Sequence, residues 1–236
     1  LPGYCFESLE EARPYAETIP GPATEAFTAA CQKLNVHAVF GLLEADGERM
    51  FNACVLVGPG GVVGVYRKVH LPFLGIDMFT TPGDRPFAVH EIQIGDQTLR
   101  VGMNICYDGS FPEAARVMTL QGADIILLPT NWPPGSECMA GCVVNARAME
   151  NHIYYLAVNR VGNERGFRFI GMSKICAPGG HVLAEAVQEE ECLLIAEIDP
   201  EKARNKHQVR VPGKHEINRV ADRRPEMYGK LVEPKK

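Results

Sequence analysis

A cysteine at the end of an apolar, strand-like run is the first residue in this chain whose type and place suggest chemistry. Cys106 closes the run of residues 99–106, and a polar corner and the segment "FPEAAR" follow it. The thiolate is the nucleophilic form of cysteine, and unpaired N–H groups near the start of a helix favour negative charge. This placement favours a nucleophilic thiol, with the Tyr107 N–H directed at an oxyanion. The structural alternative is a buried cysteine that only packs.

A second strand-like run ends on two cations. In "VVGVYRKVHLPF", Arg67 and Lys68 follow an apolar run and precede a loop that contains Pro and Gly. A lysine beside the cysteine would stabilise a thiolate and the tetrahedral intermediate of acyl transfer. The structural alternative is a solvated surface lysine. His70 lies two residues beyond Lys68, so the two side chains point apart in extended backbone, and we interpret His70 as structural.

The pattern of apolar residues predicts the elements that position these two groups. The expected helices cover residues 22–34, 112–120 and 136–151. The expected strands cover residues 36–43, 51–57, 62–66, 87–94, 99–106, 123–129, 153–158, 167–176 and 192–199. Strands arrive in pairs and triplets with helices at intervals, which favours two mixed sheets packed face to face with helices outside.

Composition narrows the function classes. The chain of 236 residues has a formal net charge of -5 and no basic cluster with interleaved aromatic residues, which argues against nucleic acid as a partner. The longest apolar runs, such as residues 125–129, are too short to cross a membrane. Eight scattered cysteines without a CxxC pair indicate a reduced, cytoplasmic protein. Cys138 and Cys142 share a helix face, but without a second pair they do not predict a metal site.

Four segments in order resemble known motifs. "YRKVHLPF" and "NICYDGSFPEAAR" resemble the lysine and cysteine signatures of the nitrilase superfamily, the carbon–nitrogen hydrolases. "LPTNWP" and "NARAMENHIYYLAVNRVG" resemble the segments that follow them in that family, and the similarity runs from Leu1 to about Asp199. The resemblance implies an αββα sandwich of two mixed β-sheets with outer helices, and a Glu-Lys-Cys triad. It also implies no metal and no organic cofactor.

Carried over, the resemblance assigns two of the three catalytic groups. Cys106 is the nucleophile, and Lys68 stabilises the oxyanion together with the Tyr107 backbone N–H. The glutamate is expected shortly before the Gly3-Tyr4 turn, roughly three residues upstream of Leu1, and this sequence does not contain it. The reaction needs such a base to take the thiol proton and protonate the leaving amine. We therefore expect an N-terminal segment upstream of residue 1, and little activity from a polypeptide that begins at Leu1.

Other residues are candidates for positioning the substrate. Asp77 is the best match to a second acid that many family members carry after the lysine, and a loop aspartate that caps N–H groups is the alternative. Asn131 and Trp132 follow a strand end and either line the pocket or shape its rim. An apolar pocket that tolerates aliphatic substrates is expected from a set of loop residues: Phe73, Ile76, Met78, Phe79 and Trp132. Arg147 and Glu150 are expected to form a structural pair on one helix.

The expected function is hydrolysis of a nonpeptide carbon–nitrogen bond, in a small aliphatic amide or a related N-carbamoyl compound, through a cysteine thioester. Gly109 and Ser110 stand where the branch acting on N-carbamoyl-D-amino acids typically carries arginines, which weakens the case for a carboxylate-bearing carbamoyl substrate. An acyltransferase and a non-catalytic small-molecule-binding homologue remain open.

The expected organisation is a hydrolase domain over residues 1–199 and a C-terminal arm over residues 200–236. By analogy with the family, this arm and the helix at residues 136–151 are candidates for contacts in a homodimer or higher homo-oligomer.

Overall fold

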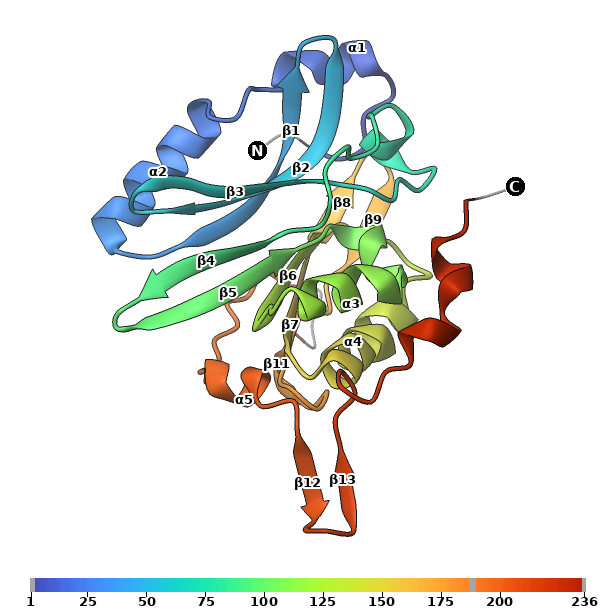
Figure 1. The fold of residues 1–236 in the computed structure, drawn as a ribbon. Helices are drawn as coiled ribbons and strands as arrows, with labels where there is room; N and C mark the ends of the chain where they lie inside the picture. Colours follow the sequence, from blue (N-terminus) through green and yellow to red (C-terminus); the bar gives the residue numbers. More distant parts are fainter. Residues whose placement is uncertain (1–2, 187–189, 235–236) are drawn as a thin grey trace.

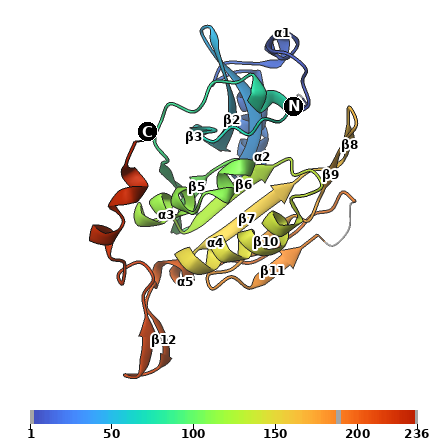
Figure 2. The same ribbon diagram turned by 90° about the vertical axis from the view of Figure 1, so that its right-hand side faces the viewer.

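Two β-sheets face each other in the computed structural model, which describes residues 3–186 and 190–234. Helix α2 (Pro22–Leu34) covers the outer face of the smaller sheet, and α3 (Pro112–Leu120) and α4 (Val144–Asn151) cover the outer face of the larger sheet (Figure 1). The layers therefore run helix, sheet, sheet, helix, which is the αββα sandwich expected from the sequence. Figure 2 shows the same layers from the side, with the larger sheet between its helices and the smaller sheet.

The smaller sheet is a meander of three strands. β1 (Ala38–Asp46), β2 (Arg49–Gly58) and β3 (Gly61–Arg67) pair antiparallel in that order. Helix α2 (Pro22–Leu34) begins on a proline, ends before the left-handed Asn35, and has the predicted bounds. Its Phe27 ring stacks on Phe40 of β1 at 3.9 Å between centroids. The three strands pair antiparallel, and Glu17 adds an isolated parallel bridge to Glu44 of β1.

The larger sheet is mixed and has the order β11-β10-β7-β6-β5-β4. β5, β6 and β7 run parallel at its centre, and the outer pairings are antiparallel. Its outer face is covered by α3 (Pro112–Leu120), which has the predicted bounds, and by α4 (Val144–Asn151), which a π-helical turn, η4 (Met139–Val143), precedes. Its strands are β4 (Val89–Ile94), β5 (Gln97–Met103), β6 (Ile125–Thr130), β7 (Tyr154–Asn159), β10 (Lys174–Cys176) and β11 (Val182–Glu185).

Two strand predictions are wrong. The run at residues 167–176 is split into β9 (Phe167–Ile170), which pairs with β8 (Val161–Glu164), and β10 in the larger sheet. Gly171 and Met172 have φ values of 62° and 56°, so the chain turns between these strands. Residues 192–199 form no strand, and Leu193 is 83% exposed. The apolar run there predicted a strand, but in the described chain no neighbouring strand edge pairs with it.

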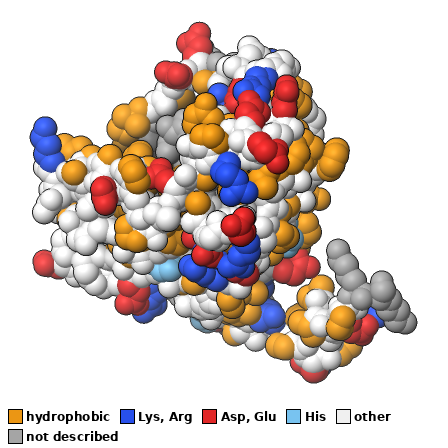
Figure 3. Space-filling view, turned by 90° about the horizontal axis from the view of Figure 1, so that it is seen from above, with side chains coloured by type: hydrophobic (Ala, Val, Ile, Leu, Met, Phe, Trp, Pro, Cys, Tyr) orange, Lys and Arg blue, Asp and Glu red, His pale blue; other side chains and the backbone are white. Residues whose placement is uncertain are grey.

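The ends of the described chain lie outside the two sheets. Near the N-terminus α1 (Leu9–Ala12) leads into the short 3-10 turn η1 (Arg13–Tyr15). After α5 (Pro200–Arg204) comes the hairpin β12 (Gln208–Val211) and β13 (His215–Ile217), then the turns η5 (Pro225–Met227) and η6 (Gly229–Val232). Seen from above, charged side chains of both signs are interspersed with apolar ones, and the C-terminal segment projects at one corner (Figure 3). None of the helices in the described residues is long and apolar enough to cross a bilayer.

Candidate active site

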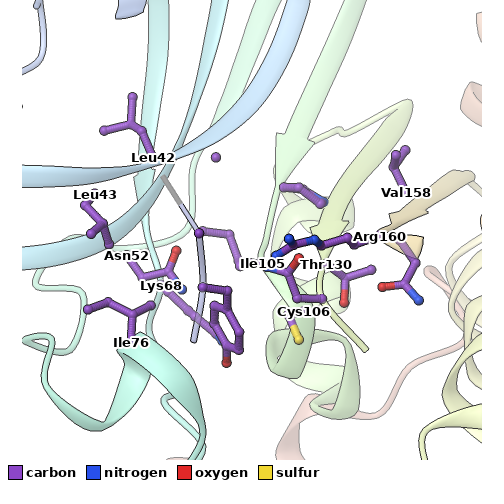
Figure 4. A pocket seen from close by; sticks show the side chains of 16 residues that line it. Leu42, Leu43, Asn52, Lys68, Ile76, Ile105, Cys106, Thr130, Val158 and Arg160 are labelled. Atoms are coloured by element: carbon purple, nitrogen blue, oxygen red, sulfur yellow. The ribbon is translucent and has the colours of Figure 1, made fainter. Parts of the chain in front are cut away.

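A cavity of about 550 Å³ lies where the two sheets meet. Figure 4 shows that the smaller sheet and the loop after it supply one side, and that the larger sheet supplies the other. Cys106 and Lys68, predicted separately from two strand ends, both line this cavity. The lining residues are Gly3, Tyr4, Gly41, Leu42, Leu43, Asn52, Lys68, Ile76, Ile105, Cys106, Pro129, Thr130, Asn131, Val158, Asn159 and Arg160.

Cys106 sits on a sharp turn between β5 and α3. It is the first residue of the 3-10 turn η3 (Cys106–Ser110), and its φ of 48° is left-handed, which is unfavourable for a residue with a Cβ atom. The side chain is 7% exposed and lines the cavity. This turn separates the cysteine from the start of α3 at Pro112, so Cys106 does not stand directly before the α-helix. Strain of this kind at a cavity-lining residue is typical of functional sites.

The turn is held by the buried carboxylate of Asp108. Its Oδ2 accepts hydrogen bonds from the Ile105 N–H at 2.9 Å and from the Tyr66 hydroxyl at 2.8 Å. Its Oδ1 accepts the His70 N–H at 3.1 Å and lies 2.7 Å from His70 Nδ1. His70 thus anchors the turn and is not one of the residues lining the cavity. The carboxylate joins the end of β3 to the cysteine turn across the two sheets.

A second support comes from α4. Arg147 donates from Nε to the Gly109 carbonyl at 3.1 Å and from Nη1 to Glu150 Oε1 at 2.9 Å. The predicted pair of Arg147 and Glu150 is therefore present. Glu150 holds the guanidinium of Arg147 in place, and Arg147 in turn binds the Gly109 carbonyl of the cysteine turn. Arg147 is 9% exposed, so this contact is largely shielded from water.

Lys68 is held in a buried cluster of polar groups. Its Nζ lies 2.5 Å from Asp77 Oδ2, and both side chains are 0% exposed. Asp77 also accepts the Tyr4 hydroxyl at 2.7 Å and the Asn52 side-chain N–H at 2.8 Å. Burial, with the nearby negative charge of Asp77, raises the pKa of Tyr4, so its hydroxyl remains a donor. Every charge in this cluster therefore has a partner, which a buried ion pair requires.

The N-terminal segment is fixed to the hairpin of β8 and β9 by Glu164 of β8. Its carboxylate accepts the backbone N–H groups of Tyr4 at 2.9 Å and of Cys5 at 3.1 Å, and it pairs with Arg160. Gly3 and Tyr4 consequently line the cavity, although they lie far from Cys106 in the sequence. The segment closes one side of the site.

The structure separates the predicted positioning residues. Asp77 lies behind Lys68 as its ion-pair partner, and Asn131 lines the cavity. Trp132 is 3% exposed and packs in the core, so it shapes the rim from behind and is not one of the lining residues. Of the five residues expected to form an apolar pocket, Ile76 is in the lining, whereas Phe73 is 93% exposed. The remaining two, Met78 and Phe79, are also outside the lining.

Several lining residues were missed from the sequence. The apolar ones come from β1, from the ends of β6 and β7, and from Ile105 before the cysteine turn. The polar ones are Tyr4, Asn52, Thr130, Asn159 and Arg160. Asn52 carried a usable signal, because it is a polar residue within the apolar run of residues 51–57. Within the described residues, no group of three or more His, Cys, Asp or Glu side chains is placed to hold a metal ion.

An αββα sandwich that brings a cysteine and a lysine to one cavity between its sheets is the arrangement of the nitrilase superfamily of enzymes. The family model for carbon-nitrogen hydrolases matches residues 1–208, and the chain belongs to that family. It is 40% identical over 229 residues to a nitrilase of Pyrococcus abyssi, covering 96% of this chain and 82% of that protein. It is 28% identical to N-carbamoylputrescine amidase of Solanum lycopersicum, covering 97% and 79% of the two chains.

A solved structure agrees with this assignment. The carbon-nitrogen hydrolase from Helicobacter pylori G27 superimposes with a TM-score of 0.78 at 28% identity, over 90% of this chain and 76% of that one. Sequence similarity and structural similarity therefore both support the assignment of the fold and of the enzyme family.

Proposed function

We propose that this enzyme hydrolyses a nonpeptide carbon–nitrogen bond, in a small amide or a related N-carbamoyl compound, through a thioester on Cys106. The observation that carries the proposal is that Cys106, on its strained turn, and the buried Lys68 line one cavity. Relatives named nitrilase, N-carbamoylputrescine amidase and formamidase support the class of bond.

The proposed reaction has two steps. The Cys106 thiolate attacks the amide carbon, and Lys68 Nζ and the Tyr107 N–H stabilise the oxyanion of the tetrahedral intermediate. The intermediate collapses to a thioester as the leaving amine takes a proton. Water then attacks the thioester, releases the acid and returns the proton to the base. The fixed, desolvated Lys68 needs little reorganisation as the charge develops.

The proton carrier in this scheme is the glutamate expected upstream of Leu1. Gly3 and Tyr4 line the cavity, so a residue a few positions before them is within reach of the site at about 3.3–3.6 Å per extended residue. The same glutamate would take the thiol proton in the first step and activate water in the second.

The test is ammonia release by the full-length polypeptide from a panel of short amides, carbamoyl compounds and nitriles. We expect release from at least one amide, and its loss in Cys106→Ala. Release that persists in Cys106→Ala would contradict the thioester. A folded protein that releases no ammonia would contradict hydrolysis, and product analysis with an added amine would then show acyl transfer or a purely binding role.

We also propose a cytoplasmic homo-oligomer built from a hydrolase domain at residues 1–199 and an arm at residues 200–236. All eight cysteines are free, which suits a reducing compartment. The arm exposes several apolar side chains, which supports a contact with a second copy: Val209, Val211, Met227, Leu231 and Val232. We expect Leu231→Glu to lower the mass measured by light scattering, and an unchanged mass would contradict the arm's role.

A further inference from the structure

A carboxylate outside the cavity binds the backbone of two residues at its edge. Strands β8 and β9 form a two-stranded sheet of their own, and Glu164 is the last residue of β8. Its Oε1 accepts the N–H of Tyr4 at 2.9 Å and the N–H of Cys5 at 3.1 Å, and its Oε2 lies 3.0 Å from the Tyr4 nitrogen. Arg160 donates to the same carboxylate. Two consecutive backbone groups and one cation therefore meet at a single side chain.

A glycine at position 3 permits this close approach. A Cβ atom on Gly3 would lie 1.9 Å from Glu164 Oε1 and 2.8 Å from its carboxyl carbon, so any side chain there would displace the carboxylate. Burial raises the pKa of Glu164, but the N–H groups of Tyr4 and Cys5, with Arg160, outweigh it and lower the pKa. The carboxylate is therefore ionised at neutral pH and accepts from all three groups.

Tyr4 carries this restraint across the cavity to the wall that holds Lys68. Its carbonyl accepts the Ile76 N–H at 2.8 Å, and its hydroxyl donates to Asp77 Oδ2 at 2.7 Å. The same carboxylate is the ion-pair partner of Lys68. Tyr4 is thus bound at its N–H from the hairpin of β8 and β9, and at its carbonyl and hydroxyl from the loop after the smaller sheet.

We propose that Glu164 is a positioning residue for the hydrolysis, and that it acts by binding the backbone of residues 3–5. Held in this way, Tyr4 keeps its contact with Asp77 and closes the cavity beside Cys106. Glu164 is outside the lining, so it acts through this segment and not on the substrate. This inference rests on the proposed function and extends it to a residue away from the reacting atoms. The proton carrier expected upstream would depend on the same contact, because it precedes the bound segment by only a few positions.

The first test measures kcat and KM in the full-length enzyme and in Glu164→Gln and Glu164→Asp, with the amide that is hydrolysed fastest in the panel. Glutamine has an N–H donor in place of one acceptor oxygen, so either the backbone groups or Arg160 lose their acceptor. We expect kcat to fall about tenfold in Glu164→Gln with KM little changed, since a misplacement of about 1 Å can cost about 10²-fold in rate. Glu164→Asp keeps the charge and should retain part of the activity.

Arg165→Gln is the matched control for this test. Arg165 lies on the same hairpin and pairs with Glu11 of α1, so it also joins the hairpin to the N-terminal region. Both side chains are outside the lining, and Arg165→Gln should retain the kcat of the unaltered enzyme. An unchanged kcat in Glu164→Gln, or an equal loss in Arg165→Gln, would overturn the proposal.

A double-variant cycle tests the contact itself. Gly3→Ala places a Cβ atom where the carboxylate lies, so it should lower kcat in a chain that contains Glu164. The same change should have little further effect in Glu164→Ala, where the carboxylate is absent, because residues in contact are not additive. Losses that multiply in the double variant would mean that the two positions act independently, and would overturn the proposal.

Alkylation by iodoacetamide needs no turnover and keeps the two proposals apart. Cys106 is 7% exposed, and release of the N-terminal segment opens one wall of its cavity. We therefore expect Cys106 in Glu164→Gln to be alkylated about threefold faster or more than in the unaltered chain. Peptide mass spectrometry follows each cysteine: Cys54, which is 0% exposed, reports any unfolded protein, and exposed Cys138 reports the reagent.

The two readouts separate the possible failures. If Cys106 alkylation depends on Glu164 but the enzyme hydrolyses no amide, Glu164 positions the site and the hydrolase proposal fails. If amides are hydrolysed but neither kcat nor alkylation depends on Glu164, the positioning role fails and the hydrolase proposal stands.

Discussion

The two walls of the cavity hold their reactive groups in different ways. On the smaller sheet, Lys68 lies in ordinary extended chain, with its N–H bonded to Asn52 O at 2.8 Å and its carbonyl bonded to the Gly83 N–H at 2.8 Å. Its charge has a partner, and its side chain is excluded from water. On the larger sheet, Cys106 has a strained backbone, and its Sγ has no hydrogen-bond partner in the described residues. One wall is preorganised by charge and the other by backbone geometry.

This difference teaches which interactions each group requires. A charged lysine side chain can be buried in the folded protein only if a counter-charge lies beside it, so the neighbours of Lys68 are polar. A nucleophilic sulfur needs open access and a fixed direction, so its turn is restrained through Asp108 and Arg147, which bind backbone on either side of it. The site is therefore sensitive to electrostatic changes on one wall and to backbone changes on the other.

The largest effect is expected from removing the charge on the Lys68 wall. Lys68→Met should reduce kcat about 10²–10³-fold, the loss seen when one oxyanion donor is removed. It should also destabilise the fold by about 3–5 kcal/mol, because Asp77 is left as a buried unpaired charge. Ammonia release and urea unfolding measure the two effects. The double variant Lys68→Met/Asp77→Leu should recover stability without activity, and recovery of both would contradict the role of Lys68.

The next effect concerns the carboxylate that spans the two walls. Asp108→Asn has one acceptor oxygen in place of two, so at least one of the donors from Ile105, Tyr66 and His70 loses its partner. We expect a loss of about 1.5–3 kcal/mol in unfolding free energy, the range for hydrogen bonds to charged groups. We also expect slower alkylation of Cys106, followed by peptide mass spectrometry, with exposed Cys138 as the internal control. Unchanged alkylation would show that the turn does not depend on Asp108.

A smaller effect should reveal the strain on the cysteine wall. At a φ of 48° glycine is unstrained, whereas alanine is not, so Cys106→Gly should be more stable than Cys106→Ala by about 1–2 kcal/mol. Ala115→Gly in α3 is the matched control, and it should be less stable than the unaltered chain by about 1 kcal/mol. Both are measured by denaturant unfolding. A Cys106→Gly variant that is no more stable than Cys106→Ala would mean that the turn stores no strain.

The last prediction contrasts Lys68 with Lys206, a half-buried lysine that donates to backbone carbonyls and has no carboxylate partner in the described residues. Its Nζ binds the carbonyls of His152 at 2.8 Å and Asn151 at 3.3 Å. Burial, with the positive charge of Arg116, lowers the pKa of Lys206 from 10.5 to about 8.

Between these two pKa values the unfolded chain binds more protons than the folded one, so the Lys206 contribution to stability should rise from pH 8 to pH 10.5. The measurement is the difference in unfolding free energy between the unaltered chain and Lys206→Met at a series of pH values. This difference should grow above pH 8 in favour of the unaltered chain. A constant difference would contradict the lowered pKa.

The sequence was sufficient where local features decide structure. Helices α2 and α3 have the predicted bounds because each begins on a proline and carries an apolar face. Strands β2 and β3 were predicted from the apolar runs at residues 51–57 and 62–66. Cys106 and Lys68 were singled out because each follows an apolar run that ends at a turn, and the resemblance to the nitrilase superfamily then implied their roles.

Features that depend on distant partners could not be predicted. Residues 192–199 have the composition of a strand, but a strand forms only where another edge offers its backbone groups, and sequence pattern does not show that. Arg160 and Thr130 become neighbours because β6 and β7 pair in register. Tyr4 reaches Asp77 only because Glu164 holds the N-terminal segment at the cavity.

Trp132 gives the site an optical reporter. It is the single tryptophan of the chain, it is 3% exposed, and its backbone is bonded to Asn159 and Ile170. Asn131 and Asn159, which line the cavity, are its immediate sequence neighbour and its hydrogen-bond partner. Fluorescence of one buried indole therefore reports on the core and, through these two asparagines, on whatever occupies the cavity. Substrate binding can be followed in the unaltered enzyme without attaching a dye.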